Sequence, residues 1–358
     1  MTERFAPKPP WLKVRAPGGD VYHRLKQTFR QLDLATVCEE ARCPNVGECW
    51  REGTATVMLL GEVCTRGCRF CAVTTGDPRG AVDSREPEHV ARAISQLELS
   101  YVVMTMVDRD DLLDGGAGHV AATVRRLREL RHDILVETLV GDFHGHLDAV
   151  DTVVGGGVDG GPHVFAHNVE VVRRLQRSVR DVRCSYEQTM AVLRRARARL
   201  DSAAPAEPTL DDGAFRGRRL TKSSIMVGIG ETDDEVIECM RDLREAGVDI
   251  VTLGQYLRPT PKHHAVERFV PPDVFADYQR QAMAMGFLYA ASGPLVRSSY
   301  KAAEVFVRGV LGAADESAIG RTLEDRLAAA RREAARLAEP AAPELIAPSS
   351  LVRRATGP

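Results

Sequence analysis

The chain has 358 residues, of which 44% are hydrophobic and 27% charged, and its formal net charge is −2. This composition is typical of a globular protein with one large domain or two, and the near-neutral charge gives no basic field that would recruit nucleic acid. No apolar stretch approaches the ~18 residues that a membrane-spanning helix requires, and the N-terminal segment lacks the apolar core of a signal peptide.

After a Pro- and Gly-rich start and a short predicted helix over 21–35, strands and helices alternate along the chain. Apolar runs of strand length occur at 54–61, 100–107, 133–140, 163–168, 220–230, 248–256 and 286–291. Helical periodicity occurs at 86–98, 117–131, 169–176, 186–200, 233–246 and 272–285, and a charged helix is predicted at 317–338. Residues 201–218 are rich in Ala, Pro, Asp and Gly, which indicates an exposed insertion.

Strands that alternate with helices predict a parallel sheet joined by helical crossovers. Six or seven such units favour an α/β fold of the incomplete (βα)6-type TIM-like barrel kind over a complete eight-fold barrel. An open doubly wound sheet is the alternative, but no dinucleotide fingerprint follows the first strand. A cysteine-rich loop follows that strand instead, at the end of a β/α barrel where active sites lie.

Six of the eight cysteines form two triplets, spaced C-x4-C-x5-C (Cys38, Cys43, Cys49) and C-x3-C-x2-C (Cys64, Cys68, Cys71). Each triplet offers three soft thiolates, one fewer than the usual four ligands of an iron–sulfur cubane, so one iron stays open. A structural zinc site requires four closed ligands, and a disulfide framework belongs to small secreted domains, so both are weaker interpretations. Abundant free thiols indicate a reducing, cytoplasmic setting.

Other polar and reactive residues have simpler interpretations. Cys184 and Cys239 are expected to be small buried apolar residues. Four loop histidines are more easily explained as solvated side chains than as metal ligands: His144, His146, His263 and His264. The acidic segment 108–116 forms either a turn or a contact with cofactor or substrate.

The loop CTRGCRFC resembles the cluster motif of the radical S-adenosylmethionine (SAM) superfamily. Phe70 matches the aromatic residue that the superfamily usually places before the last cysteine. The resemblance implies that Cys64, Cys68 and Cys71 hold a [4Fe–4S] cluster. It also implies that the open iron binds the amino and carboxylate groups of SAM, which is cleaved to a 5′-deoxyadenosyl radical.

Longer segments, from about residue 20 to 312, resemble the lipoyl synthases of that superfamily: 38–50, 53–78, 107–119, 221–232, 248–260 and 293–302. The resemblance implies that the first triplet holds an auxiliary [4Fe–4S] cluster, with a serine of the motif Arg297-Ser298-Ser299-Tyr300 as fourth ligand. Position favours Ser299, and Ser298 is the alternative. Further residues are implied near the bound cofactor: Asn168, Gly230 and Glu231.

This resemblance implies insertion of two sulfur atoms, at C6 and C8 of an octanoyl chain on a lysine of a carrier protein, with the auxiliary cluster as sulfur source. The implied partners are an octanoylated lipoyl-carrier domain, an electron donor such as ferredoxin or flavodoxin, and a cluster-repair protein, with no nucleic acid and no membrane. The expected units are an extension with the auxiliary motif (1–52), the partial barrel (53–292), the RSSY segment (293–312) and a partly helical tail (313–358).

The chain departs from the lipoyl synthase pattern at two positions. Ala166 replaces the first asparagine of an Asn-His-Asn run, and Gly141 replaces the proline of a Pro-Asp-Phe run. These departures leave a divergent sulfur-inserting paralogue with another substrate as the alternative to lipoyl synthesis. A non-catalytic iron–sulfur protein is a third hypothesis, and both complete cysteine triplets and the intact RSSY motif count against it.

Overall fold

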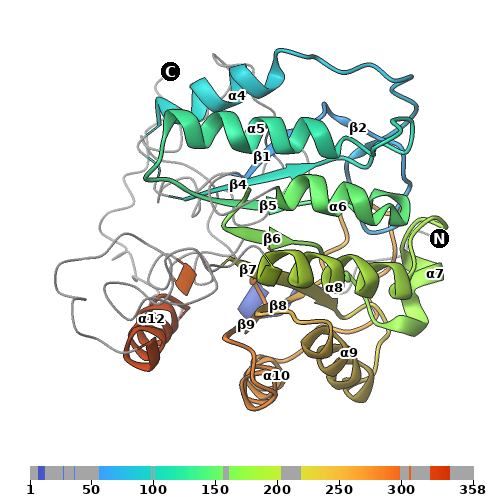
Figure 1. The fold of residues 1–358 in the computed structure, drawn as a ribbon. Coiled ribbons are helices and arrows are strands. Elements are labelled where there is room, and N and C mark those ends of the chain that lie inside the picture. The colour runs from blue at the N-terminus through green and yellow to red at the C-terminus, as the bar shows by residue number, and fades with distance from the viewer. Residues whose placement is uncertain are drawn as a thin grey trace, which may run out of the picture.

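A computed structural model describes residues 7–12, 27, 36, 56–97, 99, 101–155, 161–202, 219–298, 306–307 and 323–338. Within these residues, seven parallel strands form one sheet in the order β1-β4-β5-β6-β7-β8-β9 (Figure 1). The strands are β1 (Thr56–Leu59), β4 (Tyr101–Met106), β5 (Leu135–Leu139), β6 (Val164–Ala166), β7 (Leu220–Val227), β8 (Ile250–Gln255) and β9 (Tyr289–Gly293).

The spatial order of the strands follows their order in the chain. A doubly wound sheet would reverse direction at a switch point, so that alternative is wrong for the described strands. Strands β1 and β9 are the two edges of the sheet, and no described strand joins them. The prediction of an α/β fold with an incomplete barrel is therefore confirmed.

One main helix crosses from each strand to the next, so six βα units precede the last strand, β9 (Figure 1). These helices are α4 (Glu86–Ser95), α5 (Ala117–Leu130), α6 (Leu147–Val154), α8 (Tyr186–Ser202), α9 (Asp233–Glu245) and α10 (Pro272–Ala284). Their apolar faces pack on the sheet in two buried clusters. Parallel strands covered in this way are apolar along their length, which explains why the strand segments were recognisable.

Helix α9 shows how local sequence sets an element boundary. The hydroxyl of Thr232 accepts a hydrogen bond from the backbone N–H of Glu235, and the Glu235 carboxylate accepts one from the N–H of Thr232. This reciprocal capping satisfies two N–H groups that the first helical turn leaves unpaired. Helix α9 therefore begins at Asp233, directly after the loop that follows β7. Gly230 and Glu231 lie in that short loop, between the strand and the capped helix.

The inside of the curved sheet contains a third apolar cluster, formed largely by residues near the start of each strand: Tyr101, Leu135, Val164, Leu220, Ile250 and Tyr289. Helix α12 (Leu323–Ala338) closes this end, because Ala330 and Ala334 pack into the cluster and Arg331 Nε donates to Leu288 O at 2.9 Å. One buried ion pair, Lys222 Nζ to Glu137 Oε2 at 2.8 Å, crosses the interior. Side chains thus fill the end of the barrel where the strands begin. A functional site is therefore expected at the opposite end, where the strands end.

Some predicted elements differ from the observed ones. The helix expected over 169–176 is wrong at its start, because Glu170 forms a parallel bridge with Ile225 and only η3 (Arg173–Leu175) and α7 (Gln176–Val179) are helical. Helix α6 was not predicted, and neither was the small ladder of β2 (Val63–Cys64) and β3 (Thr74–Thr75). The predictions for 21–35 and 201–218 lie almost entirely outside the described residues, except that Asp201 and Ser202 belong to the end of α8. None of the described helices has the length and apolarity to cross a membrane.

Candidate active site

The second cysteine triplet lies on a loop directly after β1. Leu60 and Gly61 have positive φ angles of 67° and 86°, which turn the chain sharply at the strand end. The ladder of β2 and β3 closes the base of the loop, and Cys71 N donates to Cys68 O at 3.1 Å inside it. All three cysteines of the triplet are free thiols of intermediate burial. The loop therefore presents three thiols at the carboxyl edge of the sheet.

Arg66, between the first two of these cysteines, anchors the loop to the ends of β4 and β5. Its buried guanidinium pairs with Asp110 and Asp142, each at 2.7 Å, and with Asp108 at 3.6 Å. Burial alone would lower the pKa of Arg66, but the hydrogen bond with Asp110 and the charges of Asp108 and Asp142 outweigh it and raise that pKa. Sequence reasoning missed Arg66, because its carboxylate partners are distant in sequence and only the fold brings them together.

The other side of the loop is held by the segment after α7. Asp181 Oδ2 accepts from Gly67 N at 2.8 Å, and Arg69 N donates to Val179 O at 2.8 Å. The loop after β8 adds a third support, because His264 N donates to Arg69 O at 2.8 Å and His263 Nε2 lies 2.9 Å from Cys71 O. The ends of β4 and β5, the segment after α7 and the loop after β8 thus all contact the ligand loop.

The loop has features that suit a bound [4Fe–4S] cluster. Two backbone N–H groups point at thiol sulfurs: Arg66 N lies 3.4 Å from Cys64 Sγ, and Asp181 N lies 3.3 Å from Cys68 Sγ. Such N–H···S contacts stabilise thiolates and tune cluster potential. Burial raises the pKa of Cys64 to about 11 and raises that of Cys71, and a coordinated cation reverses this by deprotonating the thiol.

No three described His, Cys, Asp or Glu side chains converge on one point as they would around a single metal ion. A cubane does not require this, because each of its cysteines binds a different iron. The exposed loop side chain of His144 agrees with its interpretation as a solvated histidine, while His263 uses both ring nitrogens in hydrogen bonds.

Cys184 is buried as predicted, but it is not merely a packing residue. Its sulfur lies 3.3 Å from Arg66 Nη1. A hydrogen bond with Cys184, together with burial, raises the pKa of Cys68. The sequence contains no signal for the contact between Cys68 and Cys184. These two cysteines are 116 positions apart in the chain, and only the fold brings them together. Cys239 is buried in α9, as expected.

The residues predicted to lie near the cofactor occupy the same edge of the sheet. Phe70 packs against the cluster of buried side chains under α8 to α10, and this contact attaches the cysteine loop to the core. Asn168 Nδ2 donates to Glu170 Oε1 at 3.1 Å at the end of β6. Both carboxylate oxygens of Glu231 accept backbone N–H groups, from Gly228 at 2.6 Å and Ile229 at 2.9 Å. Glu231 therefore shapes the loop after β7, and direct contact of these residues with SAM stays a prediction.

The RSSY segment follows β9 and turns back over the barrel. Val296 packs into the interior cluster, and an added Cβ at Gly254 would lie 2.1 Å from Val296 O. Arg297 Nη1 donates to Val296 O at 2.6 Å, and Ser298 is half-buried beside it. Ser299 lies outside the described residues, as do Cys38, Cys43 and Cys49, so the auxiliary site stays a prediction.

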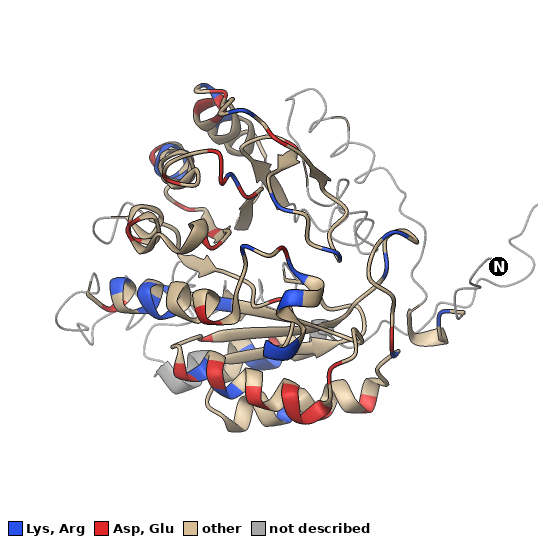
Figure 2. Cartoon of the chain, turned by 90° about the vertical axis from the view of Figure 1, so that its right-hand side faces the viewer, with Lys and Arg blue, Asp and Glu red and all other residues tan. Residues whose placement is uncertain are grey.

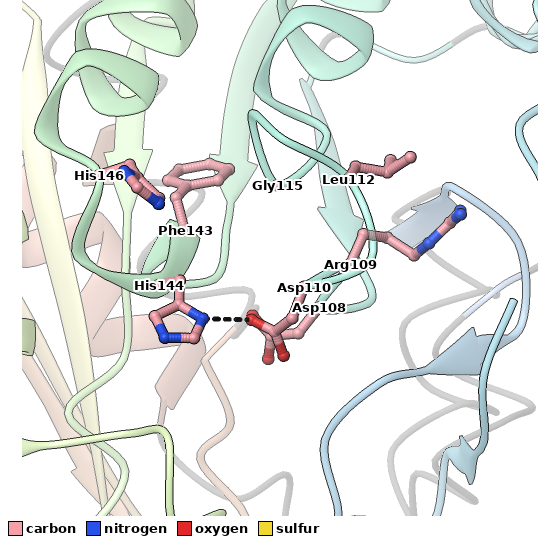
Figure 3. Close-up of a pocket in the computed structure, with 8 residues that line it drawn as sticks. All are labelled: Asp108, Arg109, Asp110, Leu112, Gly115, Phe143, His144 and His146. Carbon is pink, nitrogen blue, oxygen red and sulfur yellow. Dashed lines mark ion pairs between the residues drawn. The ribbon is translucent and has the colours of Figure 1, made fainter. Parts of the chain in front are cut away.

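A small pocket lies beside the cysteine loop, where β4 and β5 end, and is lined by Asp108, Arg109, Asp110, Leu112, Gly115, Phe143, His144 and His146 (Figure 3). His144 Nδ1 lies 3.5 Å from Asp110 Oδ1, the ion pair drawn in Figure 3. The pocket volume of about 50 Å³ is too small for an adenosyl group, since ligand pockets are typically several hundred Å³. Within the acidic segment 108–116, Asp110 pairs with Arg66 and Asp111 pairs with Arg109, and a contact of this segment with cofactor or substrate stays a prediction.

Gly141 has a physical explanation in this pocket. A Cβ at this position would lie 2.1 Å from Asp108 Oδ1, so any larger residue would force the carboxylate to move. Burial raises the pKa of Asp108 to about 6, against the lowering influence of Arg66. Glycine at position 141, instead of the usual proline, therefore allows the Asp108 carboxylate to keep its observed position. The other departure, Ala166, is a buried residue at the end of β6.

Comparison with known proteins defines the class to which this fold and site belong. The family model of the radical SAM superfamily matches residues 58–243, and the model of the N-terminal domain of lipoyl synthase matches residues 3–43. The first match covers more than half of the chain and includes the whole cysteine loop. The chain is therefore a radical SAM enzyme, a class that uses a [4Fe–4S] cluster and SAM.

Curated relatives narrow the class further. The lipoyl synthase of Sorangium cellulosum is 70% identical over 361 residues, covering 97% of this chain and 95% of that protein. The lipoyl synthase of Thermus thermophilus is 52% identical, covering 84% and 87%. The mitochondrial lipoyl synthase of Zygosaccharomyces rouxii is 51% identical, covering 85% and 75%. The chain belongs to the lipoyl synthase family.

Proposed function

We propose that the chain inserts two sulfur atoms, at C6 and C8 of an octanoyl chain held on a lysine of a carrier-protein domain, in the cytoplasm. The supporting observation is the C-x3-C-x2-C loop at the carboxyl edge of the barrel in a chain 70% identical to a curated lipoyl synthase. When bound there, the cluster supplies the electron for cleavage of SAM. The chain's own residues hold that loop rigid through Arg66 on one side and Asp181 on the other.

The auxiliary [4Fe–4S] cluster in this proposal is a substrate as well as a bound group. It is held by Cys38, Cys43 and Cys49, with Ser299 as fourth ligand and Arg297 beside it, and it donates its sulfur. A serine oxygen is a hard ligand at a soft iron, so it should dissociate more readily than a thiolate. That lability suits a cluster that must lose iron and release sulfide. A repair protein then has to rebuild the cluster after each turnover.

A second candidate is a paralogue that sulfurates another acyl or peptide substrate. The observation that favours it is the departure at Gly141, where a Cβ would lie 2.1 Å from Asp108 Oδ1, close to the cysteine loop. An anaerobic assay on an octanoyl-lysine peptide, with mass spectrometry, separates the candidates. Two added sulfurs support lipoyl synthesis. Cleavage of SAM without sulfur in the peptide supports the paralogue, and no cleavage at all would contradict both candidates.

Cys43→Ala should keep SAM cleavage and lose sulfur insertion. The two triplets are separate ligand sets, so the loop at Cys64, Cys68 and Cys71 is untouched by the change. The measurements are 5′-deoxyadenosine by chromatography and sulfurated peptide by mass spectrometry on the same sample. A Cys43→Ala protein that still forms the two-sulfur product would remove the first triplet from its role as sulfur source.

Ser299→Ala should leave the auxiliary cluster assembled on three cysteines and impair product formation, with iron content close to wild type. Ser299→Cys should hold the iron more tightly and also turn over poorly, because a thiolate resists release. Ser298→Ala is the matched control, since Ser298 is the neighbouring hydroxyl. Full activity in Ser299→Ala with loss in Ser298→Ala would move the ligand by one residue, and full activity in both would exclude serine ligation.

A further inference from the structure

Three arginines lie close together at the end of the barrel where the strands begin, opposite to the cysteine loop. Arg128 is in the last turn of α5, Arg197 is in α8, and Arg219 directly precedes β7. Arg128 Nη1 donates to Gly161 O at 2.7 Å, and a Cβ added to Gly161 would lie 2.4 Å from Arg219 Nη1. Arg197 Nη1 donates to Arg219 O at 3.1 Å. We call Arg128, Arg197 and Arg219 the arginine cluster.

Arg219 differs from most cations of this chain in its lack of a counter-charge. Along the helices in Figure 2, Lys and Arg lie among Asp and Glu, and Arg197 itself pairs with Asp201 at 2.6 Å and with Asp249 at 2.9 Å. Arg219 is only 4% exposed, and no carboxylate of the described residues forms an ion pair with it. Its Nη1 donates to Val154 O at the end of α6, and its Nη2 is buried without a hydrogen-bond partner. The buried charge of Arg219 is therefore uncompensated within the part of the chain that the structure describes.

A buried cation in this position requires a negative partner. Removing a charge from water is costly unless a counter-charge lies close to it, and the carbonyl end of α6 supplies only the partial charge of a helix dipole. The pKa of Arg219 is lowered to about 10 by burial and by the charges of three neighbours: Arg128, Arg197 and Arg199. Burial and the charges of Arg128 and Arg219 lower the pKa of His163 to about 4. Two different side chains thus report the same positive potential.

We propose that the arginine cluster binds a phosphate-type oxyanion, either inorganic phosphate or the phosphoryl group of a small metabolite. A guanidinium presents N–H donors in a planar fork that matches two oxygens of a phosphate, and such charge-assisted hydrogen bonds are strong. Two donors of the cluster are buried and unused: Nη2 of Arg219 and Nε of Arg197. A bound oxyanion supplies the missing negative charge together with acceptors for these donors. The site is at the opposite end of the barrel from the cysteine loop, so the proposal does not depend on the proposed function.

The arginine cluster joins parts of the fold that are far apart in sequence. Arg219 links β7 to the end of α6, and Arg128 links α5 to the segment before β6. Arg197 links α8 to Asp249, which directly precedes β8. An anion held by all three arginines therefore connects the amino ends of three consecutive strands. Its binding should raise the stability of the whole chain, because a ligand that binds only the folded state shifts the folding equilibrium.

The test uses the full chain with its clusters, kept anaerobic in a phosphate-free buffer at constant ionic strength. Inorganic phosphate should bind with a saturable isotherm in calorimetry, and should raise the Tm by about 2 °C at a tenfold excess over Kd. A parallel titration with glycerol phosphate distinguishes the two sources of the anion. Tighter binding of the ester identifies the phosphoryl group of a metabolite, and weaker binding identifies the free ion. Sodium chloride at the same ionic strength is the control for screening.

Arg219→Met removes the uncompensated charge and keeps an unbranched side chain. In phosphate-free buffer its Tm should equal or exceed that of wild type, because like-charge repulsion is relieved, and its affinity for phosphate should fall about tenfold. Arg128→Gln retains Arg219 and should also weaken phosphate binding about tenfold. Arg241→Gln is the matched control, since Arg241 is an exposed arginine on α9, and it should respond to phosphate as wild type does.

A carboxylate of the chain itself is the competing partner of Arg219. The segments 156–160 and 203–218 adjoin Gly161 and Arg219 in sequence and contain four carboxylates: Asp159, Glu207, Asp211 and Asp212. If one of these neutralised Arg219, Arg219→Met would lower the Tm in phosphate-free buffer and wild type would show no saturable phosphate binding, so the proposal would be wrong. A rise in Tm that is equal in wild type and Arg219→Met would also overturn it, because phosphate would then act by exclusion from the protein surface and not at a site.

Discussion

Cys68→Ala should reduce formation of 5′-deoxyadenosine to background. The change removes one of the three thiolates on the loop after β1, and a cubane with two protein ligands has no defined open iron for SAM. Iron content should fall from about eight to about four per chain, because only the auxiliary cluster remains. The measurements are iron and sulfide analysis and chromatography of the reaction mixture under dithionite.

Cys239→Ala is the matched control for this experiment. Cys239 is also a free thiol, but it is buried in α9 away from the cysteine loop. Its removal should leave both iron content and SAM cleavage close to wild type. Undiminished 5′-deoxyadenosine from Cys68→Ala would show that the loop is not the cofactor-cleaving site, however well its sequence matches the superfamily.

Much of the fold was predictable because parallel strands covered by helices are apolar throughout, and their runs stand out in the sequence. Helices α5 and α9 were located closely for a similar reason, since each has one apolar stripe and a clear boundary. The segment at 169–172 does not adopt the helix that its periodicity predicts. Its valines are spaced as on a helix face, but they are buried in an extended segment that bridges to β7 through Glu170, so tertiary contacts overrode the periodicity.

The site was predictable where its residues are close in sequence and not elsewhere. The triplet Cys64, Cys68 and Cys71 is a local pattern with its own chemistry, so its spacing alone predicts a ligand set. The contacts that hold it come from distant segments: Asp110 follows β4, Asp142 follows β5, and Asp181 follows helix α7. A single sequence does not show which loops meet at one edge of a barrel. The acidic segment was noticed, but its partner Arg66 was not.

Arg66→Leu should lower the free energy of unfolding by about 3–5 kcal/mol, because it leaves buried carboxylates without their counter-charge. Asp142 is fully buried, and its Oδ2 already has no hydrogen-bond partner among the described atoms, so it cannot gain solvent in compensation. The variant should also bind less iron on the cysteine loop, since Arg66 is the link between that loop and the ends of β4 and β5. Thermal unfolding and iron analysis give the two readouts.

Two further variants separate loss of stability from loss of loop position. Arg66→Lys keeps the charge but not the planar fork that bonds Asp110 through Nε and Nη2 at once. It should therefore recover part of the stability and little of the cluster loading. Lys222→Met removes a buried cation from the barrel interior, where its partner is Glu137. It should cost a similar free energy and leave iron on the loop unchanged. If Lys222→Met lost as much iron as Arg66→Leu, cluster loading would follow global stability, and the anchoring role of Arg66 would be wrong.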